Sequence, residues 1–306
     1  MADELFLALR RLGPSLSSRI AAELQTSHNL KAGTARQRIA RRSPPVRSVD
    51  LPFPKGASFL YLEEQWQSSA FWSGLAQSLE DSNGAYARAI WALRARGGLM
   101  PISHFAAATG NASVNVAGQL GANVVRERFT NAGLLKEVAL PDGSLCIGFP
   151  DVVESDESVN AMRSRLLAEI ILLKELKEWA RRLNFGSWDS FNMRGDPDKP
   201  TVARFEWDIT APSYLGAVTT WSPITKSLKN GFLIFDVVLE VLDEKAVRPY
   251  IYKLEAMRQM RNLGRCMQFV VAQGYQPDAW NALRSRGITV SYTHLRAHET
   301  KANLVC

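Results

Sequence analysis

The 306-residue sequence has few of the residues and motifs that mark the common enzyme classes. It contains three cysteines and four histidines, and those before the last seventeen residues are Cys146, Cys266, His28 and His104, far apart in sequence. A Cys/His zinc site and a histidine-dependent catalytic triad are therefore not expected. Neither a GxxxxGK[ST] loop nor a strand-led GxGxxG occurs, so no motif indicates nucleotide binding.

Long apolar runs are absent too, because no stretch of eighteen apolar residues occurs, and the N-terminus lacks the pattern of a secretory signal. With three cysteines, no disulfide framework is expected. We therefore expect a cytoplasmic bacterial protein without a membrane span. The sequence is 46% hydrophobic, and its 37 Lys+Arg against 30 Asp+Glu give a net charge of +7. Such a composition is typical of two or three globular domains.

The last seventeen residues, VSYTHLRAHETKANLVC (290–306), resemble the translation of a sequencing-library adapter. We expect this tail to be an artefact and the native chain to continue past Thr289. His294, His298 and Cys306 are then no indication of a metal site.

Basic residues are concentrated near the N-terminus, where seven of them stand against the single acid Glu23 between residues 15 and 47. Residues 1–66 predict three short helices and a β-hairpin, in the order of a winged helix-turn-helix. That resemblance implies DNA binding through the third helix. The candidate DNA-binding residues in and beside it are Lys31, Arg36, Arg38, Arg41 and Arg42. The alternative is a helical scaffold with a surface arginine cluster.

Residues 67–150 repeat this order with less charge. Helices are predicted over 84–98, 102–110 and 114–135, followed by a hairpin over 136–149 with a Pro-Asp-Gly turn. We interpret the first 150 residues as an α+β pair of tandem winged helices. Residues 151–160 contain four acids and no base, which predicts a solvated linker.

Residues 161–289 change character and alternate strands with helices, which predicts an α/β domain with a partly parallel sheet. A helix is expected over 249–262. If it continues, Arg258, Arg261 and Arg265 form one basic stripe, suited either to a phosphate backbone or to a solubilising surface.

Two acids occupy unusual places in this domain. Asp208 follows Phe-Glu-Trp in a predicted strand, where Phe205, Trp207 and Ile209 are expected on the opposite face. Asp236 lies in the middle of the apolar strand GFLIFDVVLEVL. An unpaired carboxylate there would be costly, so it is expected to be paired, protonated or bound to a metal. Two acids on neighbouring strands could hold Mg²⁺ or Mn²⁺.

The order of these elements resembles the restriction-endonuclease-like PD-(D/E)xK fold over about 125 residues. The resemblance implies that Asp208 and Asp236 are metal-binding catalytic acids and that Glu169 or Glu175 is the helix acid. The family's lysine should follow Asp236 by two residues, but Val238 stands there. Lys253, on the next helix, is the candidate replacement.

Two functions remain open from the sequence. One is a DNA-binding protein with a Mg²⁺-dependent endonuclease domain, in a mobile-element or phage-defence context. The other is a non-catalytic DNA-binding regulator or adaptor with a degenerate nuclease fold, acting as a homodimer or with a partner protein. Asp236 favours the first, and Val238 favours the second.

Overall fold

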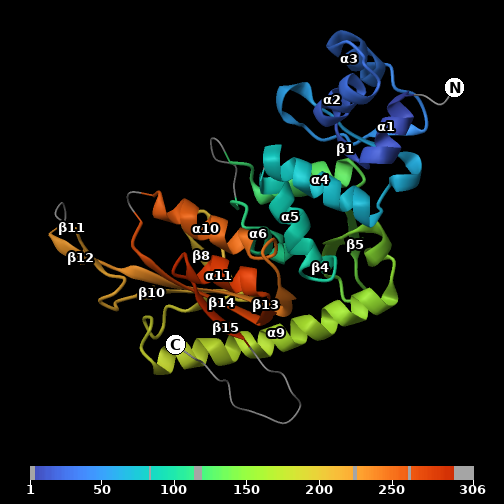
Figure 1. Ribbon diagram of the computed structural model, residues 1–306. Coiled ribbons are helices and arrows are strands. Elements are labelled where there is room, and N and C mark those ends of the chain that lie inside the picture. Colours follow the sequence, from blue (N-terminus) through green and yellow to red (C-terminus); the bar gives the residue numbers. More distant parts are fainter. Residues whose placement is uncertain (1–3, 83, 114–118, 223–225, 261–262, 293–306) are drawn as a thin grey trace. The chain divides into compact units, whose positions relative to one another are not determined.

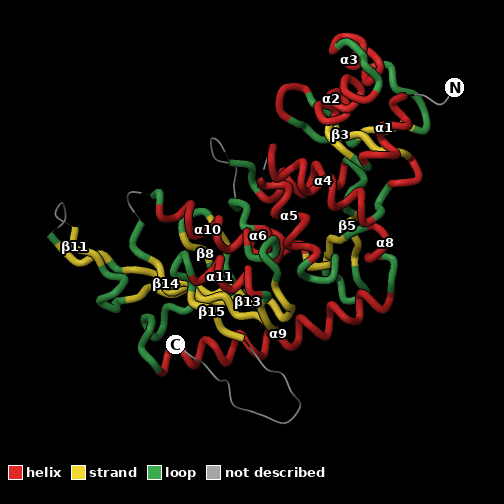
Figure 2. Tube along the Cα trace, viewed as in Figure 1, coloured by secondary structure: helices red, strands yellow, loops and turns green. Residues whose placement is uncertain are grey.

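The computed structural model describes residues 4–82, 84–113, 119–222, 226–260 and 263–292 and combines helices with strands (Figure 1, Figure 2). The chain divides into two compact units, residues 1–90 with 125–135 and residues 91–124 with 136–306. The expected α+β character is confirmed at this coarse level. The units divide the expected block 67–150, so the finer domain boundaries stay a prediction. Within the described ranges, no helix is long and apolar enough to cross a membrane.

The first unit begins with three helices and a small sheet. Their bounds are α1 (Glu4–Leu12), β1 (Ser15–Leu16), α2 (Ser17–Ser27), α3 (Ala32–Ala40), β2 (Val46–Ser48) and β3 (Phe59–Leu62). Strand β3 lies between β1 and β2 and is antiparallel to both. Apolar side chains of the helices and of β3, among them Leu5, Leu24, Ile39 and Leu60, form one core. The expected helices and hairpin are present, while β1 and the following helix α4 (Ser69–Ser82) were not expected from the sequence.

A similar order of elements follows along the chain. It comprises α5 (Gly84–Arg94), β4 (Leu99–Pro101), α6 (Phe105–Thr109), α7 (Ala122–Asn131), β5 (Lys136–Ala139) and β6 (Leu145–Gly148). Here β6 is the central strand of a β4-β6-β5 sheet. The helix predicted over 114–135 is wrong in its length. Gly121 pairs with Ala112 in a parallel bridge, and α7 begins directly after it at Ala122; residues 114–118 lie outside the described ranges.

The segment 151–160, expected to be a linker, is mostly helical. It contains most of α8 (Pro150–Val153) and the start of the 27-residue helix α9 (Asp156–Arg182). The Ser155 side chain caps α9 by accepting a hydrogen bond from the Ser158 N–H at 3.2 Å. The acids Asp156 and Glu157 lie in its first turn, where the helix dipole favours negative charge. These acids therefore start a helix instead of keeping the chain solvated.

The C-terminal part of the chain is built on a five-stranded sheet of order β15-β14-β13-β10-β7 (Figure 1). Its strands and covering helices are β7 (Asn192–Met193), β10 (Ile209–Ser213), β13 (Gly231–Leu242), α10 (Arg248–Arg258), β14 (Cys266–Tyr275), α11 (Pro277–Arg284) and β15 (Thr289–Tyr292). Strands β13, β14 and β15 are parallel, and β10 is antiparallel to β13 and β7. The partly parallel sheet expected from the sequence is thus present. Residues 290–292 of the presumed tail belong to β15, and residues 293–306 lie outside the described ranges.

Helix α9 packs on one face of this sheet, and α10 and α11 pack on the other (Figure 2). Successive side chains of a strand point to opposite faces, so Phe235 and Val237 of β13 pack with α9, whereas Ile234 and Val238 pack with α10. The Phe235 ring stacks on Phe269 of β14 at 4.7 Å between centroids. By the same alternation, Asp236 belongs to the α10 face.

The strand expected around Asp208 is interrupted. Strand β9 (Phe205–Glu206) pairs with β8 (Thr201–Val202) in a separate two-stranded sheet, and β10 begins only at Ile209. Trp207 packs in the core on the α10 face and Ile209 in the core on the α9 face. The predicted alternation of Phe205, Trp207 and Ile209 on one face is therefore wrong, because the chain changes sheets at Asp208.

Helix α6 approaches the first turn of α10 closely. It ends at Gly110, whose φ of 64° is left-handed. A Cβ atom there would lie 2.6 Å from the carbonyl oxygen of Pro249. Only glycine satisfies both the backbone angle and this contact.

Candidate functional site

The two acids singled out in the sequence lie next to each other between β10 and β13. The N–H of Asp208 donates to the carbonyl of Phe235 at 3.0 Å, and its Oδ2 accepts the N–H of Val237 at 2.7 Å. Asp208 is thereby held by the residues on either side of Asp236. Both carboxylates are buried, with 2% and 1% of their residue surface exposed. The structure therefore brings together two residues 28 positions apart in sequence.

Lys253 of α10 supplies the counter-charge of Asp236. Its Nζ lies 2.5 Å from Asp236 Oδ1, and the lysine has no exposed surface. The ammonium also donates to the carbonyls of Ala107 and Glu206, at 3.1 and 3.2 Å. It lies 3.8 Å from the ring centroid of Trp207, within the range of a cation–π interaction. All three N–H bonds of the ammonium thus have acceptors, as a buried charge requires.

Arg194 joins the other two acids. Its Nη2 lies 2.6 Å from Glu169 Oε2, and its Nη1 lies 3.1 Å from Asp208 Oδ1. Glu169 comes from α9 and is buried, whereas Glu175, the other candidate helix acid, is exposed. Arg165 also approaches Glu169, with 3.8 Å between Nε and Oε1. In this network, carboxylates and cations therefore alternate. They come from three segments of the chain: α9, the loop after β7 and the residue before β10.

Burial and neighbouring charges shift the proton affinities of this network. Burial raises the pKa of Asp236 to about 6, against the opposing attraction of Lys253. Burial likewise lowers the pKa of Lys253, against the attraction of Asp236. His104, just before α6, has its pKa lowered to about 3, first by burial and then by repulsion from Arg194. His104 is therefore neutral near pH 7 and adds no further positive charge.

Two further buried polar residues border the Asp236–Lys253 pair. Gln268 of β14 donates from Nε2 to Asp236 Oδ2 at 3.3 Å. Arg96 donates to the hydroxyl of Tyr250 at 3.1 Å, and burial raises the pKa of that hydroxyl to about 12. Sequence reasoning missed these residues and Arg194. Gln268 could have been singled out from the sequence, because like Asp236 it is a polar residue inside an apolar strand. Arg194 lies in a loop, where no sequence pattern marks it.

The carboxylates as arranged do not fit a bound Mg²⁺. Such an ion needs several oxygen ligands in octahedral geometry together with water. Glu169 and Asp208 are already paired with Arg194, Arg165 also approaches Glu169, and Asp236 is paired with Lys253. In the part of the chain that the structure describes, no three His, Cys, Asp or Glu residues gather in a way that could hold a metal. A cation could enter only if these protein cations moved away.

The candidate DNA-binding residues around α3 fall into two groups. Lys31, Arg36 and Arg41 are exposed. Arg38 forms an ion pair with Glu4 at 2.8 Å, and Arg42 donates to Ser48 Oγ at 2.7 Å. The first three are therefore the stronger candidates for contacts with a phosphate backbone.

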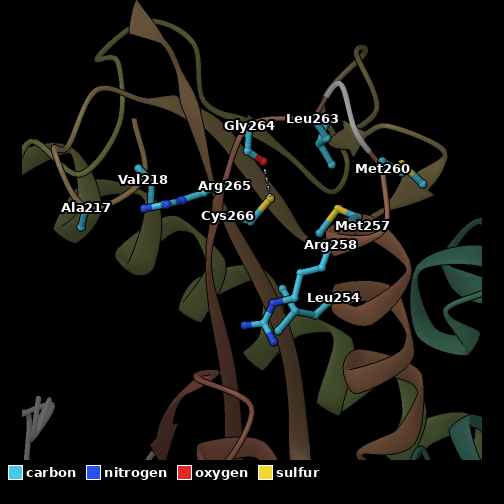
Figure 3. A pocket seen from close by; sticks show the side chains of 10 residues that line it. All are labelled: Ala217, Val218, Leu254, Met257, Arg258, Met260, Leu263, Gly264, Arg265 and Cys266. Carbon is cyan, nitrogen blue, oxygen red and sulfur yellow. Dashed lines mark hydrogen bonds between the residues drawn. The ribbon is translucent and has the colours of Figure 1, made fainter. Parts of the chain in front are cut away.

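The predicted stripe of Arg258, Arg261 and Arg265 is wrong, because α10 ends at Arg258. Arg258 and Arg265 instead line a pocket of about 360 Å³ at the start of β14, and Arg261 lies outside the described residues (Figure 3). The other lining side chains are mostly apolar, among them Val218, Leu254 and Met257. Arg258 Nη2 donates to the carbonyl of Arg286 at 2.7 Å. Arg258 and Arg265 thus lie at the same pocket, although only Arg258 belongs to α10.

No protein-family model matches this chain, and comparisons with curated proteins and with solved structures find no match. The functional argument therefore depends on the geometry alone.

We expect Asp236→Asn and Lys253→Met to lower the free energy of unfolding by about 3–5 kcal/mol each, because either change leaves a buried charge without its partner. The double variant should lose clearly less than the sum of the two. Denaturant unfolding in a double-mutant cycle measures this coupling. Glu255→Gln is the control, because Glu255 lies on the same helix as Lys253 and its ion pair with Arg286 is exposed; it should cost under about 1 kcal/mol. Additive losses from the two buried changes would contradict the assignment.

The lowered pKa of His104 predicts acid sensitivity. Between pH 6.5 and about 3 the unfolded chain binds a proton at this histidine that the folded chain does not. Its contribution to stability is thus complete above pH 6.5 and is lost as the pH falls, by at most about 1.4 kcal/mol per pH unit. His104→Gln should flatten this part of the stability profile, measured by unfolding at successive pH values. His28→Gln is the control; if it flattens the profile equally, His104 is not the cause.

Proposed function

We propose that this is a DNA-binding protein whose N-terminal part docks α3 in the major groove. The observation that carries the proposal is the order α1-β1-α2-α3-β2-β3 with the strand order β1-β3-β2. This arrangement supports a winged helix-turn-helix, in which the third helix reads DNA. Exposed Lys31, Arg36 and Arg41 in or next to α3 supply positive charge for the phosphates.

The second half of the N-terminal region supports the same interpretation. The series α5-β4-α6-α7-β5-β6 has its strands in the equivalent order β4-β6-β5. A tandem pair of winged helices accounts for both series. In the second series, charged candidates for DNA contacts are fewer, so we assign the main contact to α3.

We further propose that the C-terminal domain has a PD-(D/E)xK-like architecture and does not cut DNA. The order of α9, the antiparallel strands β7, β10 and β13, helix α10 and the parallel strand β14 supports the architecture. The buried ion pairs support the absence of cleavage, because Arg194 and Lys253 occupy the oxygens of the acids that would bind the metal. The domain then acts as a regulator or adaptor module.

We expect Arg36→Ala/Arg41→Ala to weaken duplex binding and to lower the slope of log K against log salt by about 2, since each lost phosphate contact removes about one released counterion. Fluorescence anisotropy at several salt concentrations measures both quantities. Lys174→Ala/Arg182→Ala removes the same charge from exposed positions on α9 and should leave the slope unchanged. Equal slopes for wild type and the α3 variant would remove α3 from the proposal.

A Mg²⁺-dependent endonuclease is the second candidate, favoured by one observation. Lys253 places its ammonium 2.5 Å from Asp236, although the lysine expected at position 238 is a valine. An ammonium beside the acid is what stabilises developing phosphate charge in such enzymes. For this function Arg194 would have to leave Glu169 and Asp208.

Incubation of purified protein with plasmid DNA and Mg²⁺ or Mn²⁺ separates the two candidates. We expect no nicked or linear product from wild type or from Asp208→Ala. Cleavage by wild type that a folded Asp208→Ala variant lacks would establish the endonuclease instead. Equal cleavage by both would indicate a contaminating nuclease and leave the expected outcome unchanged.

A further inference from the structure

A β-hairpin extends from the sheet beyond the paired ends of β10 and β13. Its strands are β11 (Thr220–Ser222) and β12 (Ser227–Lys229), and residues 223–225 between them are not described. Ser213 pairs with Gly231 where β10 ends and β13 begins. The hairpin is drawn at the far end of this strand pair in Figure 1. The hairpin therefore projects from the C-terminal end of β10, whereas Asp208 lies directly before its N-terminal end.

The hairpin exposes two large apolar side chains. Trp221 and Leu228 are paired directly across its two strands, so their side chains share one face. Trp221 is 62% exposed and Leu228 is 65% exposed. Tyr214, in the loop that leads into the hairpin, is 62% exposed as well. Aromatic and apolar side chains are thus presented to solvent on a narrow two-stranded arm.

The stretch of chain that forms this arm carries charged residues of one sign. No Asp or Glu occurs from Ile209 to Phe235, whereas Lys226 and Lys229 lie on β12 or directly before it. At the base of the hairpin, Val218 lines the same pocket as Arg258 and Arg265 (Figure 3). Basic residues therefore accompany the exposed rings from the hairpin to the start of β14.

We propose that this surface, formed by Trp221, Leu228, Lys226, Arg258 and Arg265, binds single-stranded DNA. Trp221 stacks on an unpaired base, Leu228 supports the ring from the partner strand, and the basic side chains contact the phosphates. Exposed aromatic rings beside a basic groove are the combination that binds single strands without sequence preference. The inference rests on the proposed DNA-binding function and adds a second contact, distinct from α3.

The test compares two probes, a fluorescent oligo(dT) of 20 nucleotides and a blunt duplex, on the full-length protein. Trp221→Ala and Lys226→Glu should each weaken oligo(dT) binding about ten-fold or more and change duplex binding less than two-fold. Trp188→Ala, which removes another exposed tryptophan of this part of the chain, and Lys174→Glu are the matched controls and should change neither. Circular dichroism and unfolding of each variant establish that it is folded.

The two proposals can fail separately. Duplex binding that depends on Arg36 and Arg41, together with oligo(dT) binding that is absent or unaffected by Trp221→Ala, overturns the hairpin inference alone. Duplex binding that is absent or independent of α3, with Trp221-dependent oligo(dT) binding, overturns the role of α3 and keeps the hairpin. Self-association that Trp221→Ala abolishes, measured by sedimentation velocity without DNA, would assign the hairpin to a second copy of the chain and overturn the inference.

Discussion

Burying charged side chains in a low-dielectric core is tolerated only where each one has a partner and saturated hydrogen bonds. In the C-terminal part of this chain that constraint joins α9, the loop after β7, the start of β10, the middle of β13 and helix α10. Glu169, Arg194 and Asp208 form one series of contacts, and Asp236 with Lys253 forms the other. Displacing any of these elements would expose a charge to an apolar surrounding, so the network fixes their relative positions.

The same network limits what the domain can do. Nuclease chemistry would need acids that are open to a hydrated cation, whereas these carboxylates are paired with cations of the chain itself. The positive partners of these acids are guanidinium and ammonium groups of the chain instead of a metal ion. Their hydrogen bonds are directional, and their positions depend on packing. As arranged, these acids stabilise the packing of the domain.

Much of the fold could be predicted from the sequence, for identifiable reasons. Helices α1, α2 and α3, the apolar strand around Asp236 and the helix that carries Lys253 follow from periodicity and from turn residues. The proximity of Lys253 to Asp236 followed only from the resemblance to a nuclease fold. Other features depend on tertiary contacts. The change of sheets at Asp208 has no local signal, and α10 stops at Arg258 although the residues after it suit a helix. Arg194 could not be found because its role exists only when α9 and β10 meet.

The contact between Gly110 and Pro249 has a consequence for the buried lysine. Three residues before Gly110, the carbonyl of Ala107 accepts a hydrogen bond from Lys253, and four residues after Pro249 the chain reaches that lysine itself. A side chain at position 110 would push the two helices apart and lengthen the bond between Ala107 and Lys253. A glycine, which has no side chain, thereby influences how well backbone carbonyls solvate the Lys253 ammonium. Substitution at position 110 would then be limited by electrostatics as well as by shape.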